Sequence, residues 1–466
     1  MLRIDFTNMI APAVGGGVTE GAFRESADAF AKAHAHVATR HAEGVLGFLD
    51  IPEDRARLAQ VTDAASAILG RRGEDRVTDV VVLGIGGSAL GPIALRTALV
   101  APRWNELDDA ARDGRPRLHV LDNVDPGTVT ALLDRLVPRH TVFIVTSKSG
   151  GTAETMAQDL VVRGWLERSL GAGAKRQLVF VTDPQKGALR ALARGEGILA
   201  LDIPPNVGGR FSVLTAVGLL PAALIGIDVA ALLDGAAGMR TRCASRELAA
   251  NPAGVFAVLQ WLADTRCSRP IQVLMPYSDP LRDLAAWFVQ LWAESLGKHR
   301  EAGDPGFGPT PIPALGATDQ HSQVQLFMEG PGDKTVTFIA VGEPAADVVI
   351  PALHGDVPEL GYLAGHRLGE LLDIERRATA GALARRGRPN MTIELDRVDA
   401  RAMGELFMLF ELATVYAGAL YGVDPMDQPG VELGKQFTYA MLGRADAEQA
   451  RQEWNLLPKS DPKFTI

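Results

Sequence analysis

The chain has 466 residues, of which 47% are hydrophobic and 22% charged, and its formal net charge is −9. This length predicts roughly two to four domains, of which two is the simplest count, and the acidic balance excludes the broad basic surface that a nucleic-acid partner requires. The two cysteines are too few for a disulfide framework or a four-cysteine zinc site, so we expect a reducing, cytoplasmic location.

Residues 1–70 are rich in alanine, and their apolar residues recur near helical spacing, which predicts a helical N-terminal scaffold segment. No apolar stretch of signal-peptide length follows the N-terminal charges, so secretion is not expected. The uncharged run 211–227 approaches the length of a membrane helix, but its two glycines and its proline favour a buried helix instead. We therefore expect no membrane partner.

From residue 77 onward, short β-branched runs alternate with helical stretches, which is typical of parallel sheets covered on both faces. This pattern predicts an α/β fold of two doubly wound domains with mainly parallel sheets. The strands are expected at 77–85, 117–123, 141–147 and 176–183, then at 271–279, 334–341 and 390–396, with a helix at 281–298. The predicted boundaries are 1–70 for the N-terminal segment, 71–235 and 236–440 for the two domains, and 441–466 for a C-terminal helical tail.

The first strand ends in the sequence GIGGSA, which supports two interpretations. Gly84, Gly86 and Ala89 fit a loose dinucleotide fingerprint, but the acidic residue that should follow after roughly 20 positions is missing, because Asp122 lies too far away. Alternatively, the hydroxyl of Ser88 at a helix N-terminus suits a terminal phosphate group. A third possibility is that Ser88 only caps the helix.

The loop SKSGGT after the third strand favours the phosphate interpretation. Gly150 and Gly151 allow close approach of the backbone, and the other residues supply hydroxyl groups and a cation. These are Ser147, Lys148, Ser149 and Thr152. Because the carboxyl ends of parallel strands share one edge, both loops are expected to converge on one compact phosphomonoester. The alternative is an ordinary solvated turn.

Two further segments carry candidate catalytic groups. Arg210 follows two glycines in VGGRFS, where its guanidinium could stabilise a developing oxyanion, unless it is an ordinary surface arginine. Glu294 lies at the border of the apolar face of its predicted helix, beside Trp287, where partial desolvation would make it a stronger base. Taken alone, the position of Glu294 favours an ordinary ion pair with Lys298, four residues later.

Three polar residues in the second half of the chain are weaker candidates when taken singly. His321 lies in the loop sequence GATDQHSQVQL, and Gln428 and Lys435 flank a Pro/Gly turn that leads into a helix. Isolated histidines and lysines are usually structural or solvated, so these residues gain weight only from their order along the chain.

The ordered series GIGGSALGP, SKSGGTAET, NVGGR, AESLGK, DQHSQVQL and QPGVELGK resembles the phosphoglucose isomerase family, also called the glucose-6-phosphate isomerase family. The resemblance runs from about Leu83 to Lys435. It implies two domains of the sugar isomerase (SIS) type and a homodimer. It also implies interconversion of glucose 6-phosphate and fructose 6-phosphate without a metal or an organic cofactor.

The resemblance also implies roles for individual residues. Glu294 would move a proton between C2 and C1 of the sugar, and Arg210 would stabilise the cis-enediolate between them. His321, contributed by the partner subunit, and Lys435 would open the sugar ring. The residues expected to hold the phosphate are Ser88, Ser147, Lys148, Ser149 and Thr152, and Gly87, Glu154 and Gln428 would line the remainder of the substrate site.

Some positions depart from the family pattern. Gly151 replaces a threonine, Leu296 an asparagine and Pro429 a tryptophan, which bears on substrate affinity more than on reaction type. Retention of Gln428 favours glucose 6-phosphate over a dual specificity that includes mannose 6-phosphate. A noncatalytic sugar-phosphate sensor and, more distantly, a nicotinamide dehydrogenase are the alternatives from other classes.

Overall fold

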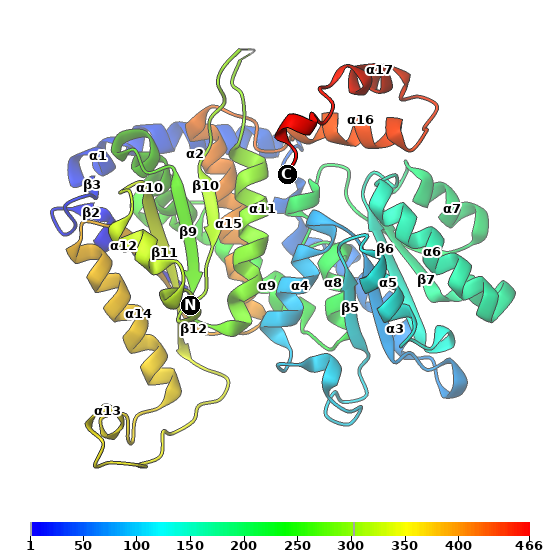
Figure 1. The fold of residues 1–466 in the computed structure, drawn as a ribbon, viewed down its shortest axis with the longest axis horizontal. Coiled ribbons are helices and arrows are strands. Elements are labelled where there is room, and N and C mark those ends of the chain that lie inside the picture. The colour runs from blue at the N-terminus through cyan, green and yellow to red at the C-terminus, as the bar shows by residue number, and fades with distance from the viewer. Residues whose placement is uncertain (1, 302) are drawn as a thin grey trace.

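Two five-stranded sheets, one in each half of the molecule, organise the fold (Figure 1). The computed structural model describes residues 2–301 and 303–466. All strands of the first sheet are parallel, in the order β5-β4-β6-β7-β8. Their bounds are β4 (Asp79–Leu83), β5 (Arg117–Leu121), β6 (Thr141–Ser147), β7 (Leu178–Thr182) and β8 (Leu199–Asp202).

Helices cover both faces of this sheet. Successive side chains of a strand point to opposite sides, so the buried apolar strands present an apolar surface on each face. Val80 and Val82 of β4 join one hydrophobic cluster, whereas Val81 and Leu83 join another. On the first side lie α4 (Leu90–Leu99), α8 (Ala216–Leu224) and α3 (Arg55–Leu69). On the second lie α5 (Pro126–Leu133), α6 (Ala153–Leu170) and α7 (Ala188–Glu196). The expected doubly wound arrangement is confirmed here.

The second sheet has the order β1-β12-β11-β9-β10 and is parallel except for β1, which pairs antiparallel with β12. The strands are β9 (Ile271–Pro276), β10 (Thr310–Pro313), β11 (Lys334–Glu343), β12 (Asn390–Arg397) and β1 (Arg3–Asp5). Helices α12 (Val324–Glu329) and α14 (Leu368–Arg385) cover one face. All seven predicted strands are present, and β1, β8 and β10 were not predicted.

Helices between the two sheets join the halves through one continuous core. They include α9 (Val229–Arg242), α10 (Pro252–Cys267), α11 (Arg282–Leu296) and α15 (Ala400–Tyr421). Helix α15 is long and apolar enough to cross a membrane, but 83% of its apolar window is buried inside the protein, as in a core helix. The run 211–227, predicted to be a buried helix, contains α8, in which every residue except Ala223 is buried.

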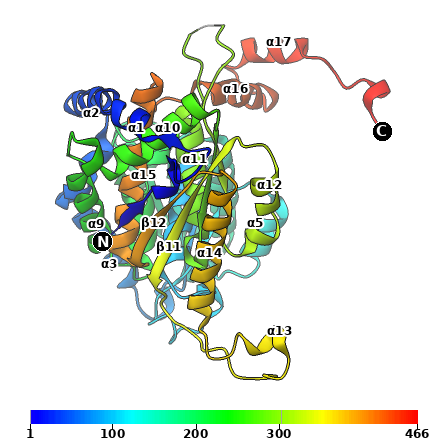
Figure 2. The same ribbon diagram turned by 90° about the vertical axis from the view of Figure 1, so that its left-hand side faces the viewer.

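The two ends of the chain extend the basic plan. The N-terminal segment forms the predicted helices α1 (Glu20–Glu25), α2 (Ala27–Ala42) and α3, together with β1 and the small pair β2 (Ile10–Ala11) and β3 (Val18–Thr19). At the other end, α16 (Glu432–Met441) and α17 (Glu448–Leu456) pack on each other through a small cluster of their own and project from the body (Figures 1 and 2). The predicted domain boundaries stay predictions, and the one after residue 440 falls at the end of α16.

Candidate active site

The first sheet reverses its direction of winding between β4 and β6, which are hydrogen-bonded neighbours. In open α/β sheets, ligands bind in the crevice outside the carboxyl ends of the strands, at such a switch point. The loop after β4 holds Ser88, in the short helix η5 (Gly86–Ser88), and the loop after β6 holds residues 148–152. The Ser88 side chain caps neither η5 nor α4, so the interpretation of Ser88 as a simple helix cap is wrong.

Three predicted phosphate ligands come together in the loop after β6. The Ser147 hydroxyl lies 3.0 Å from that of Thr152 and 3.4 Å from that of Ser149, and the last two are also 3.4 Å apart. Thr152 precedes α6 without capping it through its side chain, which leaves the N–H groups of the first turn available to an anion. Glu154 lies in that first turn. The loop is therefore a cluster of hydroxyls at a helix N-terminus.

Lys148 points elsewhere. Its ammonium donates a hydrogen bond to the Pro205 carbonyl at 2.8 Å and to none of the three clustered hydroxyls. Burial lowers the pKa of Lys148, and the nearby Asp183 carboxylate partly opposes this shift. In this conformation Lys148 fixes the loop to the segment before Arg210 instead of adding a cation to the hydroxyl cluster.

Gly87 brings the loop after β4 into contact with the loop that carries Arg210. A Cβ atom on Gly87 would lie 2.2 Å from the Gly209 carbonyl oxygen, so only glycine permits this backbone approach. Gly86 has a positive φ of 57°, and a Cβ atom there would lie 2.9 Å from the Gln290 side-chain nitrogen. The Ser88 loop thus contacts both the loop of Arg210 and helix α11.

Arg210 is buried, and its guanidinium is held on several sides. Its Nε donates to the Ser295 hydroxyl at 2.7 Å, one terminal nitrogen donates to the Gln428 side-chain oxygen at 2.8 Å, and the other donates to the Asp427 carbonyl at 2.9 Å and to the Pro425 carbonyl. A guanidinium has five N–H donors, so these bonds leave one free, on the nitrogen that faces Glu294. The alternative of a surface arginine is wrong.

Glu294 is the acidic partner of this arrangement. Its carboxylate lies 3.7 Å from the Arg210 guanidinium, its side chain is 25% exposed, and Gln290 donates to it at 3.3 Å. Lys298 instead binds Asp427 at 2.5 Å, so the simple pair between Glu294 and Lys298 does not form. Sequence analysis missed Gln290, although its spacing of four residues places it on the same helix face as Glu294.

The structure brings Gln428 to Arg210 but leaves two other candidates apart. His321 is exposed at the end of η12 (Thr318–His321), and Lys435 is exposed on α16, where it pairs with Glu432 at 2.8 Å. Within the described residues, no hydrogen bond or ion pair joins His321 or Lys435 to Glu294 or Arg210.

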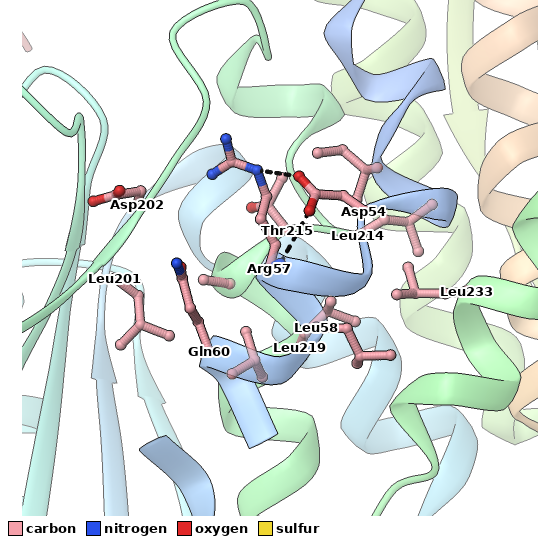
Figure 3. Close-up of a pocket in the computed structure, with 13 residues that line it drawn as sticks. Asp54, Arg57, Leu58, Gln60, Leu201, Asp202, Leu214, Thr215, Leu219 and Leu233 are labelled. Carbon is pink, nitrogen blue, oxygen red and sulfur yellow. Dashed lines mark hydrogen bonds and ion pairs between the residues drawn. The ribbon is translucent and has the colours of Figure 1, made fainter. Parts of the chain in front are cut away.

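Two hollows are separate from the hydroxyl cluster, and the larger one borders the Arg210 site at Pro425. Figure 3 shows Leu58, Leu219 and Leu233 around a space between α3 and α8, with Asp54 and Arg57 paired beside it at 2.7 Å. Its volume of about 10 Å³ holds at most one water molecule. A larger groove of about 600 Å³ lies between α2 and the end of α15 and reaches residues 424–426. In the described part of the chain, no three His, Cys, Asp or Glu side chains gather to hold a metal ion.

Comparison with known proteins decides the family. The model of the phosphoglucose isomerase family matches residues 31–346 and 378–457. This chain belongs to the phosphoglucose isomerase family. A glucose-6-phosphate isomerase of Rubrobacter xylanophilus is 48% identical over 95% of this chain and 98% of its own length, and one of Carboxydothermus hydrogenoformans is 43% identical over 100% and 99%.

Solved structures agree with this family assignment. A hypothetical protein of Thermus thermophilus superposes with a TM-score of 0.84 at 40% identity, covering 95% of this chain and all of its own. A glucose-6-phosphate isomerase of Chlamydia trachomatis shares the fold at a TM-score of 0.69 and 22% identity, over 86% of this chain and 77% of that one. The SIS-type architecture expected of a phosphoglucose isomerase family member is therefore present.

Proposed function

We propose that this protein interconverts glucose 6-phosphate and fructose 6-phosphate, a reaction of glycolysis and gluconeogenesis. The observation that carries the proposal is the free N–H of Arg210 beside the Glu294 carboxylate. The Ser88 loop packs against the Arg210 loop through Gly87 and Gly209, and Lys148 joins the hydroxyl-cluster loop to Pro205, in the segment before Arg210. A base and a fixed cation at this separation suit a reaction that removes a proton next to a carbonyl group and leaves charge on oxygen.

The phosphate ester serves as a handle. The hydroxyls of Ser88, Ser147, Ser149 and Thr152, with the N–H groups at the start of α6, hold it, and Glu154 and Gly87 complete the wall of the site. In our proposal the Lys148 ammonium leaves Pro205 for the phosphate when substrate binds. The interactions with the phosphate group position the sugar so that C1 and C2 lie beside Glu294.

Proton transfer follows ring opening. His321 and Lys435 open the ring by moving the proton of the anomeric hydroxyl to the ring oxygen while the bond between C1 and the ring oxygen breaks, which leaves a carbonyl group at C1. Glu294 then takes the proton from C2 of the aldose, the electron pair forms the C1–C2 double bond, and the carbonyl oxygen becomes an enediolate oxygen that accepts from Arg210. Glu294 returns the proton to C1 while the proton of the C2 hydroxyl passes to O1, so that C2 becomes the carbonyl carbon and C1 carries the hydroxyl group of the ketose.

We further propose that the protein works as a homodimer in the cytoplasm, with His321 completing the site of the partner subunit. The exposure of His321 and the lack of a bond from it to Glu294 within one chain support this arrangement. No nucleic acid, membrane, metal or organic cofactor takes part in the reaction as proposed.

A coupled assay tests the proposal directly. Fructose 6-phosphate and mannose 6-phosphate are offered in separate reactions. Glucose 6-phosphate formed from fructose 6-phosphate is detected with glucose-6-phosphate dehydrogenase. Fructose 6-phosphate formed from mannose 6-phosphate is detected with added coupling enzymes. We expect turnover of fructose 6-phosphate and little of mannose 6-phosphate, because Arg210 holds Gln428 in place. Equal rates would favour the dual-specificity alternative.

Glu294→Gln separates an enzyme from a sugar-phosphate sensor. This change removes the base and keeps the shape of the side chain, so turnover is expected to fall by about 10²–10⁴-fold. Binding of the unreactive analogue sorbitol 6-phosphate, measured by calorimetry, is expected to stay within about threefold of that of the unmodified protein, since the phosphate handle is intact. Wild-type turnover in Glu294→Gln would contradict the assignment of the base.

A further inference from the structure

Every acceptor that holds the Arg210 guanidinium by a hydrogen bond is electrically neutral. The acceptors are the Ser295 hydroxyl, the main-chain carbonyls of Pro425 and Asp427, and the amide oxygen of Gln428. Glu294 at 3.7 Å is the carboxylate that forms an ion pair with it. Burial lowers the pKa of Arg210, and the charges of Glu294, Asp427 and Asp424 oppose this shift. The positive charge is therefore largely preserved for an oxygen of the substrate.

A second carboxylate, that of Asp427, lies close enough to the Arg210 guanidinium to neutralise part of its charge. The main-chain carbonyl oxygen of Asp427 accepts a hydrogen bond from Arg210. The Asp427 side chain branches from the Cα atom next to this carbonyl group, so it starts close to the guanidinium. The Asp427 side chain is 59% exposed where it lies now, whereas the Arg210 side chain is 2% exposed. A carboxylate that turned onto the guanidinium would compete for the free N–H and offset part of its charge.

Lys298 holds that carboxylate in another place. Its ammonium donates to the Asp427 carboxylate and to the Asp427 carbonyl, both at 2.5 Å, so one carbonyl oxygen accepts from Lys298 and Arg210 together. The Lys298 side chain is only 6% exposed. Its main chain is fixed by two hydrogen bonds of 2.9 Å with Phe307. Lys298 is thus held both at its main chain and at its ammonium group.

We propose that Lys298 is a positioning residue for Arg210, because it keeps the Asp427 carboxylate away from the guanidinium and fixes the 425–428 segment on which Arg210 and Gln428 rest. Lys298 follows the helix that carries Glu294, so one side chain sets the relative position of base, cation and Gln428. The kinetic part of this inference rests on the isomerase function proposed above, and the structural part does not.

Lys298→Met tests the kinetic part. We expect kcat to fall by about 10–100-fold with KM within about threefold, because Arg210 acts on the transition state and the phosphate site is separate. Lys298→Arg, which keeps the cation, is expected to recover part of the loss. The double variant Lys298→Met/Asp427→Asn is expected to recover more than half of it on a logarithmic scale, because no second carboxylate is left to neutralise Arg210.

Lys334→Met is the matched control, since Lys334 is also a buried lysine paired with an aspartate, Asp333, but at the start of β11. It is expected to lower the melting temperature and leave kcat within about twofold. A kcat for Lys298→Met within threefold of wild type would overturn the inference. So would a double variant that is no faster than Lys298→Met at the same melting temperature, since loss of structure alone would then explain the effect.

A crystal structure of Lys298→Met gives a readout that does not depend on activity. The inference expects the Asp427 carboxylate within hydrogen-bond distance of the Arg210 guanidinium, and an unmoved Asp427 side chain would overturn it. If the unmodified protein failed to isomerise sugar phosphates, the proposed function would fall, and this structure would still decide the role of Lys298.

Discussion

At the scale of single residues, the buried carboxylate of Asp79 illustrates how one ionised group couples stability to pH. Arg117 donates to it twice, at 2.7 and 2.8 Å, and His119 lies 3.0 Å and Thr78 2.8 Å from it. Burial raises the pKa of Asp79, but the hydrogen bonds from His119, Arg117 and Thr78 outweigh it and hold the pKa well below its ordinary value of 3.8.

The sign of the pH dependence follows from this shift. A carboxyl group whose pKa is lower in the folded state stabilises the fold above its unfolded pKa, and this contribution disappears as the pH falls from about 4 toward the folded pKa. Asp79→Asn is therefore expected to lower the free energy of unfolding at pH 7 by about 3 kcal/mol. In thermal melts between pH 7 and pH 3, the difference in melting temperature from the unmodified protein should begin to narrow below about pH 4. A gap that stayed constant over this range would contradict the role of the charge.

The sequence predicted part of the grouping of the candidate residues, but not how their side chains are paired. The hydroxyls of Ser147, Ser149 and Thr152, which lie at or after the end of the single strand β6, lie together as the loop sequence predicted. The expected convergence of Ser88, after the adjacent strand β4, on the same phosphate group stays a prediction. The choice of Lys298 between Glu294 and Asp427 depends on a segment 129 residues away, so helical spacing alone favoured the wrong partner. For the same reason, the attachment of Lys148 to Pro205 could not be foreseen.

At the scale of elements, the crossing of α9 and α15 depends on two glycines. A Cβ atom on Gly404 would lie 1.9 Å from the Leu232 carbonyl oxygen, and one on Gly235 would lie 2.0 Å from that of Arg401. Both clashes would be with backbone atoms, which cannot rotate away as a side chain can. The absence of side chains at these positions thus sets the distance between the helices that join the two halves.

Gly404→Ala is therefore expected to destabilise the protein by about 2–3 kcal/mol, because the helices must separate. Gly238→Ala is the matched control, since Gly238 lies on α9 and a Cβ atom there meets nothing within 4 Å. This control is expected to be neutral or to stabilise the protein by about 0.5–1 kcal/mol. Urea unfolding of both variants gives the comparison, and equal effects of the two changes would contradict the packing argument.

The strands of the two large sheets that sequence analysis missed share one property. The strands β1, β8 and β10 all lie at sheet edges, where fewer side chains are buried and the apolar pattern weakens. β10 even contains Pro311 and Pro313, which a central strand would not tolerate. Apart from β5, the predicted strands are interior, and those such as β4 and β6 are buried throughout, so their signal was clear.

At the scale of the whole molecule, the proposed dimer makes a prediction about mixed subunits. Glu294→Gln and His321→Ala chains, co-expressed with different tags and purified through both, would pair one subunit of each kind. If His321 serves the partner's site, one site of this heterodimer is intact, and about half of wild-type activity is expected from two inactive parents. The coupled assay described above measures it.

The reciprocal pairing is the control. A wild-type chain paired with a chain that carries both substitutions has no intact site if His321 acts across the interface, and one intact site if it acts within its own chain. Activity in this second heterodimer and none in the first would show that each subunit supplies its own His321.

The strand β1 has a consequence for how the chain is made. Arg3, Ile4 and Asp5 pair with Glu394, Ile393 and Thr392, so β1 leaves the ribosome long before the strand with which it pairs. The first sheet, built from residues 79–202, meets no such delay. Vectorial translation thus imposes an order of assembly, in which β1 stays without its neighbour until β12 has emerged from the ribosome.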